Sequence, residues 1–243
     1  MLKFLKNKKY LKAQQGFTLI EMIFVIMIFA ILSSITFFDF RTFSARISFD
    51  NLTQDVALKI VSAQKNAMMG SINSNFITRD MKPSYGMYFT VGGSTAVAVA
   101  NNQFVSFTDI PSTGTTTGNK VYDSPTNPNY QCNTPTSPEC LSVTQINTGE
   151  YIDEICYFSQ TTGLTCDAKD VHVVFTRPLP DASILYRTSF AVTTYSQAPY
   201  ACIELASPSD PLSKRTIKVN SFGQIQTYNL SATSTVSGTN ICS

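Results

Sequence analysis

One long apolar run near the start of the chain constrains its fold more than any other feature. Residues 17–38 number 22 and include a single charged side chain, Glu21. As a helix with about 1.5 Å of rise per residue, the run is roughly 33 Å long, enough for the hydrocarbon core of a bilayer. No second run of this length follows. A channel or transporter with several spanning helices is therefore excluded.

Composition limits what the remainder can be. The chain has 243 residues, of which 43% are apolar and 14% charged. This apolar fraction argues against intrinsic disorder of the whole chain. The length permits one moderate domain plus an anchor, or two small domains.

Five lysines precede the apolar run, and none follows it closely. They are Lys3, Lys6, Lys8, Lys9 and Lys12, with no acidic residue among them. Basic residues that flank a span stay in the cytoplasm, so we expect the head to lie outside. Without residues 1–16 the chain has 13 basic and 16 acidic side chains, a formal charge of −3. The predicted head is therefore mildly acidic.

Glu21 distinguishes this run from simpler alternatives. A secretory signal has a shorter apolar core and a small-residue cleavage site, and a plain signal anchor does not account for an acid. A carboxylate at mid-helix costs about 2.5–3.5 kcal/mol on insertion, and less near the end, so it indicates a function with a partner. If the chain were cut after Gly16, the new α-amino group of Phe17 would lie one helical turn from Glu21. In parallel helices, the carboxylate could instead neutralise a neighbour's amino terminus.

The segment Gly16-Phe17-Thr18-Leu19-Ile20-Glu21, between a lysine-rich leader and an apolar helix, resembles the prepilin signal of type IV pilins and type II secretion pseudopilins. The resemblance implies that a prepilin peptidase cuts between Gly16 and Phe17 and methylates the amino group of Phe17. It implies that Glu21 is needed for assembly with other pilin or pseudopilin subunits. It also implies a single-pass protein of the inner membrane, with its head outside, that later enters a pilus or pseudopilus.

The helix is predicted to continue beyond the apolar run. No glycine or proline occurs between Phe17 and Met69, and Gly70 then supplies a stop. Past Phe38 the pattern becomes amphipathic, which predicts a face that packs on a sheet. The apolar positions of that face are Ala45, Phe49, Leu52, Val56, Ile60, Ala63 and Ala67. We therefore divide the chain into a cleaved cytoplasmic leader (1–16), a transmembrane and assembly helix (17–38), an amphipathic half-helix (39–70) and an exported head (71–243).

Alternating patterns predict strands in the head, and a run of strands after one helix predicts an α+β fold, with a pilin-like helix packed on antiparallel sheet. The expected strands are 85–91, 96–100, 103–108, 151–158, 171–176, 184–194, 200–205, 216–219 and 224–228. Residues 111–140, rich in proline, glycine and threonine, predict a long irregular surface loop. Segments 63–67, 85–89 and 216–225 loosely resemble the GspH/FimT group of minor pseudopilins. That resemblance, with no proline in the apolar span, favours a minor subunit.

All six cysteines follow the apolar run: Cys132, Cys140, Cys156, Cys166, Cys202 and Cys242. An even number on the exported side indicates disulfides, whereas metal sites need shorter spacings than these gaps of seven or more. Six cysteines allow fifteen pairings. Because short loops close at low entropic cost, we expect Cys132 with Cys140, Cys156 with Cys166, and Cys202 with Cys242.

The sequence has no serine nucleophile motif, phosphate loop or histidine cluster. His172 is the only histidine, and we expect a strand position that faces solvent or a hydrogen-bond partner. Asp153 and Glu154 are adjacent, so a regular strand would point them to opposite faces. Asp167 and Asp170 are oxygen ligands close in sequence, as at some calcium sites, but a solvated acidic turn is the simpler interpretation. We expect no enzyme activity, cofactor or metal.

One basic cluster keeps a second function open. Lys214, Arg215 and Lys218 are the only tight group of cations in the head, and Lys214 and Lys218 would share a strand face. Phosphate binding requires such a group. The main prediction is a prepilin-like structural subunit, and the alternative is a DNA-capturing minor pilin that contacts nucleic acid through these residues. A third is an anchored exported enzyme or binding protein whose leader only mimics a prepilin.

Overall fold

The computed structural model describes residues 16–70, 83–92, 99–110, 118–123, 132, 139–208, 210–230 and 242. This part of the chain contains one helix followed by eleven strands. Every strand pairing is antiparallel, which confirms the predicted α+β class. The chain divides into two units, residues 1–45 and 46–243.

The helix α1 spans Leu19–Met69 and ends where the sequence predicts. Gly70 has a φ of 62°, and its N–H donates to the carbonyl of Ala67. Glycine adopts this left-handed conformation without the clash of a Cβ, so it terminates the helix. Within the second unit, the buried side chains of α1 are Phe49, Thr53, Val56, Ala57, Ile60, Ala63 and Ala67. The predicted stripe is therefore the packing face, except that Leu52 is half-buried and Ala45 is exposed.

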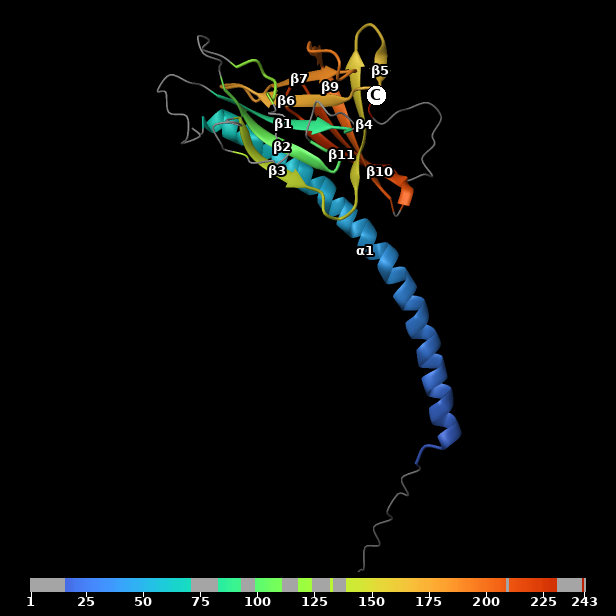
Figure 1. Cartoon of the computed structure of the whole chain (residues 1–243). Coiled ribbons are helices and arrows are strands. Elements are labelled where there is room, and N and C mark those ends of the chain that lie inside the picture. The colour runs from blue at the N-terminus through green and yellow to red at the C-terminus, as the bar shows by residue number, and fades with distance from the viewer. Residues whose placement is uncertain are drawn as a thin grey trace, which may run out of the picture. The chain divides into compact units, whose positions relative to one another are not determined.

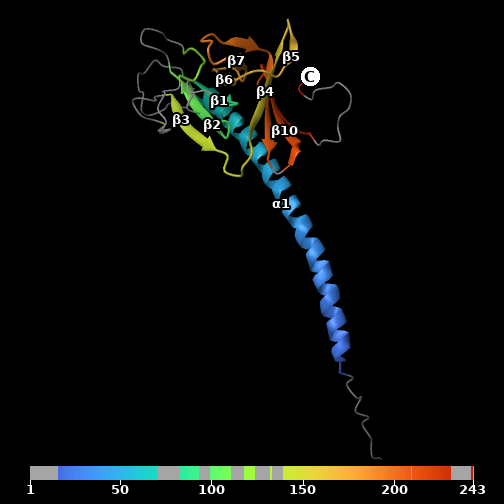
Figure 2. The same ribbon diagram turned by 45° about the vertical axis from the view of Figure 1, so that its right-hand side comes forward.

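Two antiparallel sheets form the head (Figure 1 and Figure 2). The first has the order β3-β2-β1-β6-β7-β8. Its strands are β1 (Ser84–Thr90), β2 (Gln103–Asp109), β3 (Cys140–Gln145), β6 (Asp170–Phe175), β7 (Ala182–Arg187) and β8 (Ser196–Ala198). The second has the order β11-β10-β9-β4-β5. Its strands are β4 (Tyr151–Ser159), β5 (Gly163–Thr165), β9 (Tyr200–Ser207), β10 (Asp210–Asn220) and β11 (Ile225–Leu230).

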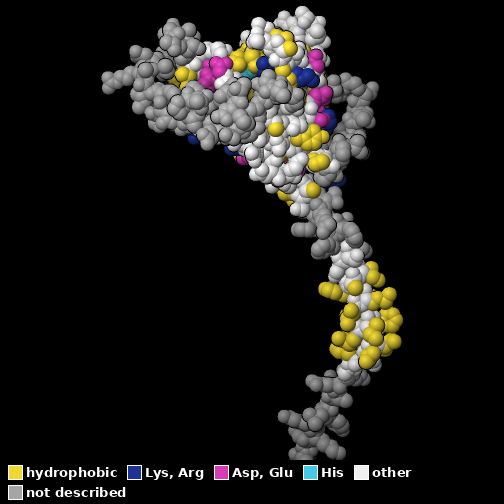
Figure 3. All heavy atoms as spheres, viewed as in Figure 1, with side chains coloured by type: hydrophobic (Ala, Val, Ile, Leu, Met, Phe, Trp, Pro, Cys, Tyr) yellow, Lys and Arg dark blue, Asp and Glu magenta, His cyan; other side chains and the backbone are white. Residues whose placement is uncertain are grey.

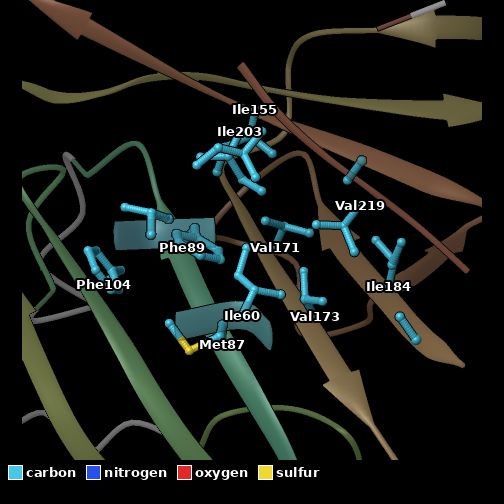
Figure 4. Close-up of a cluster of buried hydrophobic side chains, with 14 of the residues drawn as sticks. Ile60, Met87, Phe89, Phe104, Ile155, Val171, Val173, Ile184, Ile203 and Val219 are labelled. Atoms are coloured by element: carbon cyan, nitrogen blue, oxygen red, sulfur yellow. The ribbon is translucent and has the colours of Figure 1, made fainter. Parts of the chain in front are cut away.

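The main core contains apolar side chains from both sheets and from the second half of α1 (Figure 4). Its members in that view include Ile60 of the helix, Met87, Phe89, Phe104, Val171, Val173 and Ile184 of the first sheet, and Ile155, Ile203 and Val219 of the second. Burial of this apolar surface is the main contribution to the stability of the head.

A smaller apolar cluster lies on the opposite face of the first sheet. It contains Tyr88, Val99, Val105, Phe107, Tyr122, Cys140 and Val174. Successive side chains of a strand point to opposite faces. Met87 and Phe89 therefore enter the main core while Tyr88, between them, enters this cluster. As a result every residue of β1 is buried.

The prediction of a surface loop at 111–140 is wrong for several of its described residues. Tyr122, Glu139 and Cys140 are buried, and Cys140 is the first residue of β3. Tyr122 and Cys140 help to cover the second face of the first sheet. The apolar surface of β1, β2 and β6 needs such a cover. The proline and threonine content of residues 111–140 does not show that some of these residues are buried against the sheet.

Other strand predictions differ from the structure in detail. Strands β3, β5 and β8 were not expected. The strand expected at 184–194 ends as β7 at Arg187, and the rings of Phe190 and Tyr195 lie against the guanidinium of Arg187. Of the strand expected at 96–100, residues 96–98 lie outside the described residues, and 99–100 are not in a strand.

Gly86 of β1 lies between Phe107 and Val174 on the neighbouring strands. A Cβ at this position would lie 2.6 Å from Cζ of Phe107 and 3.0 Å from Cγ2 of Val174. We expect Gly86→Ala to lower the free energy of unfolding by about 1–3 kcal/mol, since overpacking forces neighbours to move. Urea denaturation measures the loss. In a Phe107→Leu background the same substitution should cost less, and equal losses in both backgrounds would contradict this packing.

Candidate functional site

The start of α1 is organised by Thr18. The N–H of Glu21 donates to Oγ1 of Thr18 at 3.3 Å, and the N–H of Met22 donates to the carbonyl of Thr18 at 3.2 Å. Thr18 is therefore the N-cap residue. A glutamate three residues after a threonine cap has the spacing of a capping box. This position puts the carboxylate of Glu21 in the first turn, where the helix dipole favours negative charge.

Gly16 and Phe17 precede the helix and are exposed. They are in neither a helix nor a strand, and a Cβ on Gly16 would meet no atom within 4 Å. The peptide bond between them is therefore accessible. Gly16, Phe17 and Glu21 were predicted from the sequence. The capping role of Thr18 was not, although the Thr-x-x-Glu spacing signals it.

The first turns of α1 expose an almost continuous apolar surface (Figure 3). Between Phe17 and Leu32, every large apolar side chain is at least 50% exposed. A continuous exposed apolar patch that extends from Phe17 to Leu32 indicates a surface that another molecule covers.

Within the described part of the chain, no helix has both the length and the apolar character that a membrane crossing demands. The span at 17–38 stays a prediction.

The six cysteines form the three disulfides expected from their order in the sequence: Cys132–Cys140, Cys156–Cys166 and Cys202–Cys242. Glu154, Cys156 and Cys166 bring three ligand-type atoms within 4.8 Å of one another. Both sulfurs of that group are in a disulfide, however, and a metal binds the thiolate. This group therefore lacks the thiolates that a metal site needs.

Lys214 of the predicted basic cluster is surrounded by acids. Its Nζ lies 2.9 Å from Asp153, 3.2 Å from Glu204 and 3.9 Å from Glu154. The prediction that Asp153 and Glu154 point to opposite faces is wrong. An irregularity in β4 between Ile152 and Glu154 breaks the alternation, as a bulge does, so both acids reach one lysine.

The other two cations also have partners. The side chain of Arg215 is 7% exposed, and its Nε lies 2.6 Å from Oδ1 of Asp50, with the guanidinium over the ring of Phe49. Nζ of Lys218 donates to the carbonyl of Cys242 at 3.1 Å and lies over the ring of Tyr200. Arg215 alternates with Lys214 and Lys218 and points to the other face of β10. The structure therefore does not gather the three into one open basic patch.

His172 is fully buried, so the expectation that it faces solvent is wrong and the alternative, a hydrogen-bond partner, holds. Its Nδ1 accepts the N–H of Tyr122 at 3.0 Å, and its ring lies against Tyr88, Phe107 and Tyr195. Burial, and secondarily the charge of Arg187, lowers the pKa of His172 to about 3. The imidazole is therefore neutral at physiological pH and joins the 118–123 segment to β6.

An ion pair that the sequence analysis missed lies beside this histidine. Asp170 is fully buried and faces Arg187 across the strands β6 and β7. Nη2 of Arg187 lies 2.6 Å from Oδ2 of Asp170, which also accepts the hydroxyl of Tyr88 at 3.0 Å. Burial raises the pKa of Asp170, and the arginine opposes that shift. These contacts commit Asp170 to the fold, which argues against its use as a calcium ligand with Asp167.

Two buried carboxylates hold the segment 118–123. Glu139 accepts the N–H of Ile110 at 3.1 Å and that of Asp123 at 2.8 Å, while Asp109 accepts the N–H of Lys120 at 3.0 Å. Burial raises the pKa of Asp109 to about 6 and that of Glu139 to about 7. Nothing in the local sequence pattern signals these contacts, because they join positions up to 29 residues apart.

The comparisons with known proteins bear on the start of the chain. The family model described as the prokaryotic N-terminal methylation motif matches residues 11–37. The match includes Gly16, Phe17, Thr18 and Glu21, so the chain carries a type IV pilin-like signal there. No curated protein and no solved structure matches the chain. The resemblance of the head to the GspH/FimT group therefore stays a prediction.

Replacing Thr18 by alanine should loosen the first turn of α1. The loss of an N-cap costs about 1 kcal/mol, so the amide proton of Glu21 should exchange roughly fivefold faster in the full chain in detergent. Thr18→Ser keeps the hydroxyl and serves as the control. Unchanged exchange at Glu21 in Thr18→Ala would show that Thr18 does not cap the helix.

Glu139 should make stability depend on pH. A carboxyl whose pKa is higher in the folded chain stabilises the fold below its ordinary pKa, and this contribution is lost as the pH rises to the folded value. For Glu139 that window runs from 4.5 to about 7. The urea midpoint should fall across this window, and it should fall less in Glu139→Gln. Equal slopes for the two proteins would contradict this assignment.

Proposed function

We propose that this chain is a prepilin-like structural subunit, either a minor pilin or a pseudopilin, with no enzymatic activity of its own. In this proposal it assembles through α1 into a type IV pilus or a type II secretion pseudopilus. The observation that carries the proposal is the methylation motif at residues 11–37. The motif coincides with an accessible Gly16–Phe17 bond and with an exposed apolar helix.

Processing is the first step of this function. A prepilin peptidase would cut after Gly16 and methylate the new amino group of Phe17. A peptidase needs an accessible bond, and the exposed residues before Leu19 meet that requirement. The cap at Thr18 starts the helix directly after the cleavage point, so removal of the leader leaves the helix start intact.

Assembly is the second step. Cleavage creates a positive amino group near the carboxylate of Glu21, in the same chain or in a neighbouring subunit. Two unit charges about 4 Å apart attract by about 4 kcal/mol at an effective dielectric constant near 20. That attraction is comparable with the cost of about 2.5–3.5 kcal/mol for a carboxylate at mid-helix, and the cost at Glu21, near the helix end, is smaller. Pairing therefore offsets the cost, while the exposed apolar side chains from Phe17 to Leu32 pack on neighbouring helices.

The proposed location of the chain changes when it assembles. Before assembly the chain would sit in the inner membrane with its head outside, and afterwards in the pilus or pseudopilus. Three disulfides in the head are consistent with an oxidising compartment.

The alternatives have less support. A DNA-capturing minor pilin needs cations that can reach phosphates. Lys214 instead contacts acids, and Arg215 is buried. An anchored exported enzyme or binding protein would leave the methylation motif without a role. The likeness of segments 63–67, 85–89 and 216–225 to the GspH/FimT group would place the chain among the minor subunits.

Mass spectrometry of the N-terminus tests the proposal. In cells that have a prepilin peptidase, the mature chain should begin with N-methylated Phe17. Gly16→Val should block cleavage, because a side chain then occupies the position before the cut, whereas Ala13→Val in the leader should leave processing intact. A mature chain that keeps Met1, or one cut after the apolar run, would overturn the proposal.

A further inference from the structure

Four cysteines gather on the second sheet. Cys156 of β4 and Cys202 of β9 are direct partners across the two strands, and both are fully buried. Their disulfide partners complete the group: Cys242 is 3% exposed and Cys166 is half-buried. All four belong to one cluster with Leu164 and Tyr200. Two disulfides therefore lie side by side.

The strand register permits a second pairing within this cluster. Residues directly opposite in an antiparallel pair have Cα atoms about 4.5–5.5 Å apart, with side chains on the same face. Disulfides span Cα distances of about 4.4–6.8 Å. Cys156 and Cys202 can therefore bond to each other while β4 and β9 keep their positions. The disulfide Cys132–Cys140 belongs to the cluster on the first sheet and is not involved.

We propose that this cluster is a thiol–disulfide exchange site for dithiol reductants, which enter at Cys166 and release Cys242 while a new Cys156–Cys202 disulfide forms. The site has no role in the assembly proposed above. Its product would be a chain in which the sheet stays cross-linked and residue 242 is no longer tied to β9.

The first step uses the accessible sulfur. Cys166 is the most exposed member of the four-cysteine cluster, so a thiolate of the reductant attacks its Sγ. A mixed disulfide forms at Cys166, and Cys156 leaves as a thiolate. That thiolate attacks Sγ of Cys202, which forms the Cys156–Cys202 bond and expels the thiolate of Cys242.

The second thiol of the reductant completes the reaction. It attacks the reductant's own sulfur in the mixed disulfide, so the reductant leaves as a disulfide and Cys166 leaves as a thiolate. The thiolates of Cys166 and Cys242 each take a proton. In total the reductant loses two electrons and two protons, and the chain exchanges two disulfides for one disulfide and two thiols.

Charged side chains around the sulfurs suit these steps. Oε1 of Glu204 lies 3.9 Å from Sγ of Cys156, and its negative charge alone would disfavour a thiolate at Cys156. Lys214 pairs with Oε2 of the same glutamate and offsets its negative charge. Nζ of Lys218 donates to the carbonyl of Cys242, so a cation lies beside the residue whose thiolate departs.

The test uses the full chain in detergent with dithiothreitol as the dithiol. After brief treatment with a limiting amount, the sample is quenched with acid, labelled with N-ethylmaleimide and mapped by mass spectrometry. We expect a peptide that links Cys156 to Cys202, and equal labelling of Cys166 and Cys242. Labelling of Cys202 and Cys242 without that link would overturn the proposal.

Variants distinguish exchange through Cys156 from direct reduction of the Cys202–Cys242 disulfide by the reductant. In Cys156→Ser the relay is broken, so labelling of Cys242 should be at least about tenfold slower. The matched control Cys132→Ser/Cys140→Ser should label Cys242 at the wild-type rate. Equal rates in Cys156→Ser and wild type would overturn the proposal. In Cys166→Ser/Cys242→Ser, Cys156 and Cys202 should form a disulfide on purification in air, and two free thiols would contradict the geometry.

Discussion

Assembly as proposed depends on one carboxylate, Glu21, in the first turn of α1, where the other large side chains as far as Leu32 are apolar. Glu21 is placed there by local chemistry, because Thr18 caps the helix and accepts the N–H of the glutamate. The large apolar side chains that follow are at least half exposed as far as Leu32. An exposed apolar surface indicates that another molecule covers it, and a charge within such a surface usually pairs with an opposite charge. Cleavage after Gly16 would create the counter-charge, the new amino group of Phe17. The cleaved helix could then pack against the helices of other subunits, which would cover its apolar surface.

The second half of α1 is packed into the head. Ile60 and its neighbours bury the helix in the main core, and Arg215 holds Asp50 from β10. Three buried titratable side chains have structural partners: Asp170 pairs with Arg187, His172 accepts the N–H of Tyr122, and Glu139 accepts backbone amides. In these contacts the titratable side chains stabilise the fold. The four-cysteine cluster differs, since its register gives two of its members a second bonding partner.

Sequence patterns predicted the features that depend on local spacing. The amphipathic stripe gave the packing face of α1, Gly70 gave its end, and sequence proximity gave the disulfide pairs. Features that depend on tertiary contacts were missed. An irregularity in β4 directs Asp153 toward Lys214. Tyr122, in the expected surface loop, is buried against the second face of β1. In the candidate site the residues were predicted, but the cap at Thr18 was overlooked.

Incorporation of Glu21→Gln into filaments tests the central claim most directly. The substitution keeps the shape of the side chain and removes its charge, and Glu21→Asp keeps the charge as the matched control. Both chains, each co-expressed with wild type, would be quantified by mass spectrometry in the membrane and in sheared filaments. The account predicts equal amounts of both in the membrane, with Glu21→Gln strongly depleted from filaments relative to Glu21→Asp. Entry of Glu21→Gln at the wild-type level would contradict it.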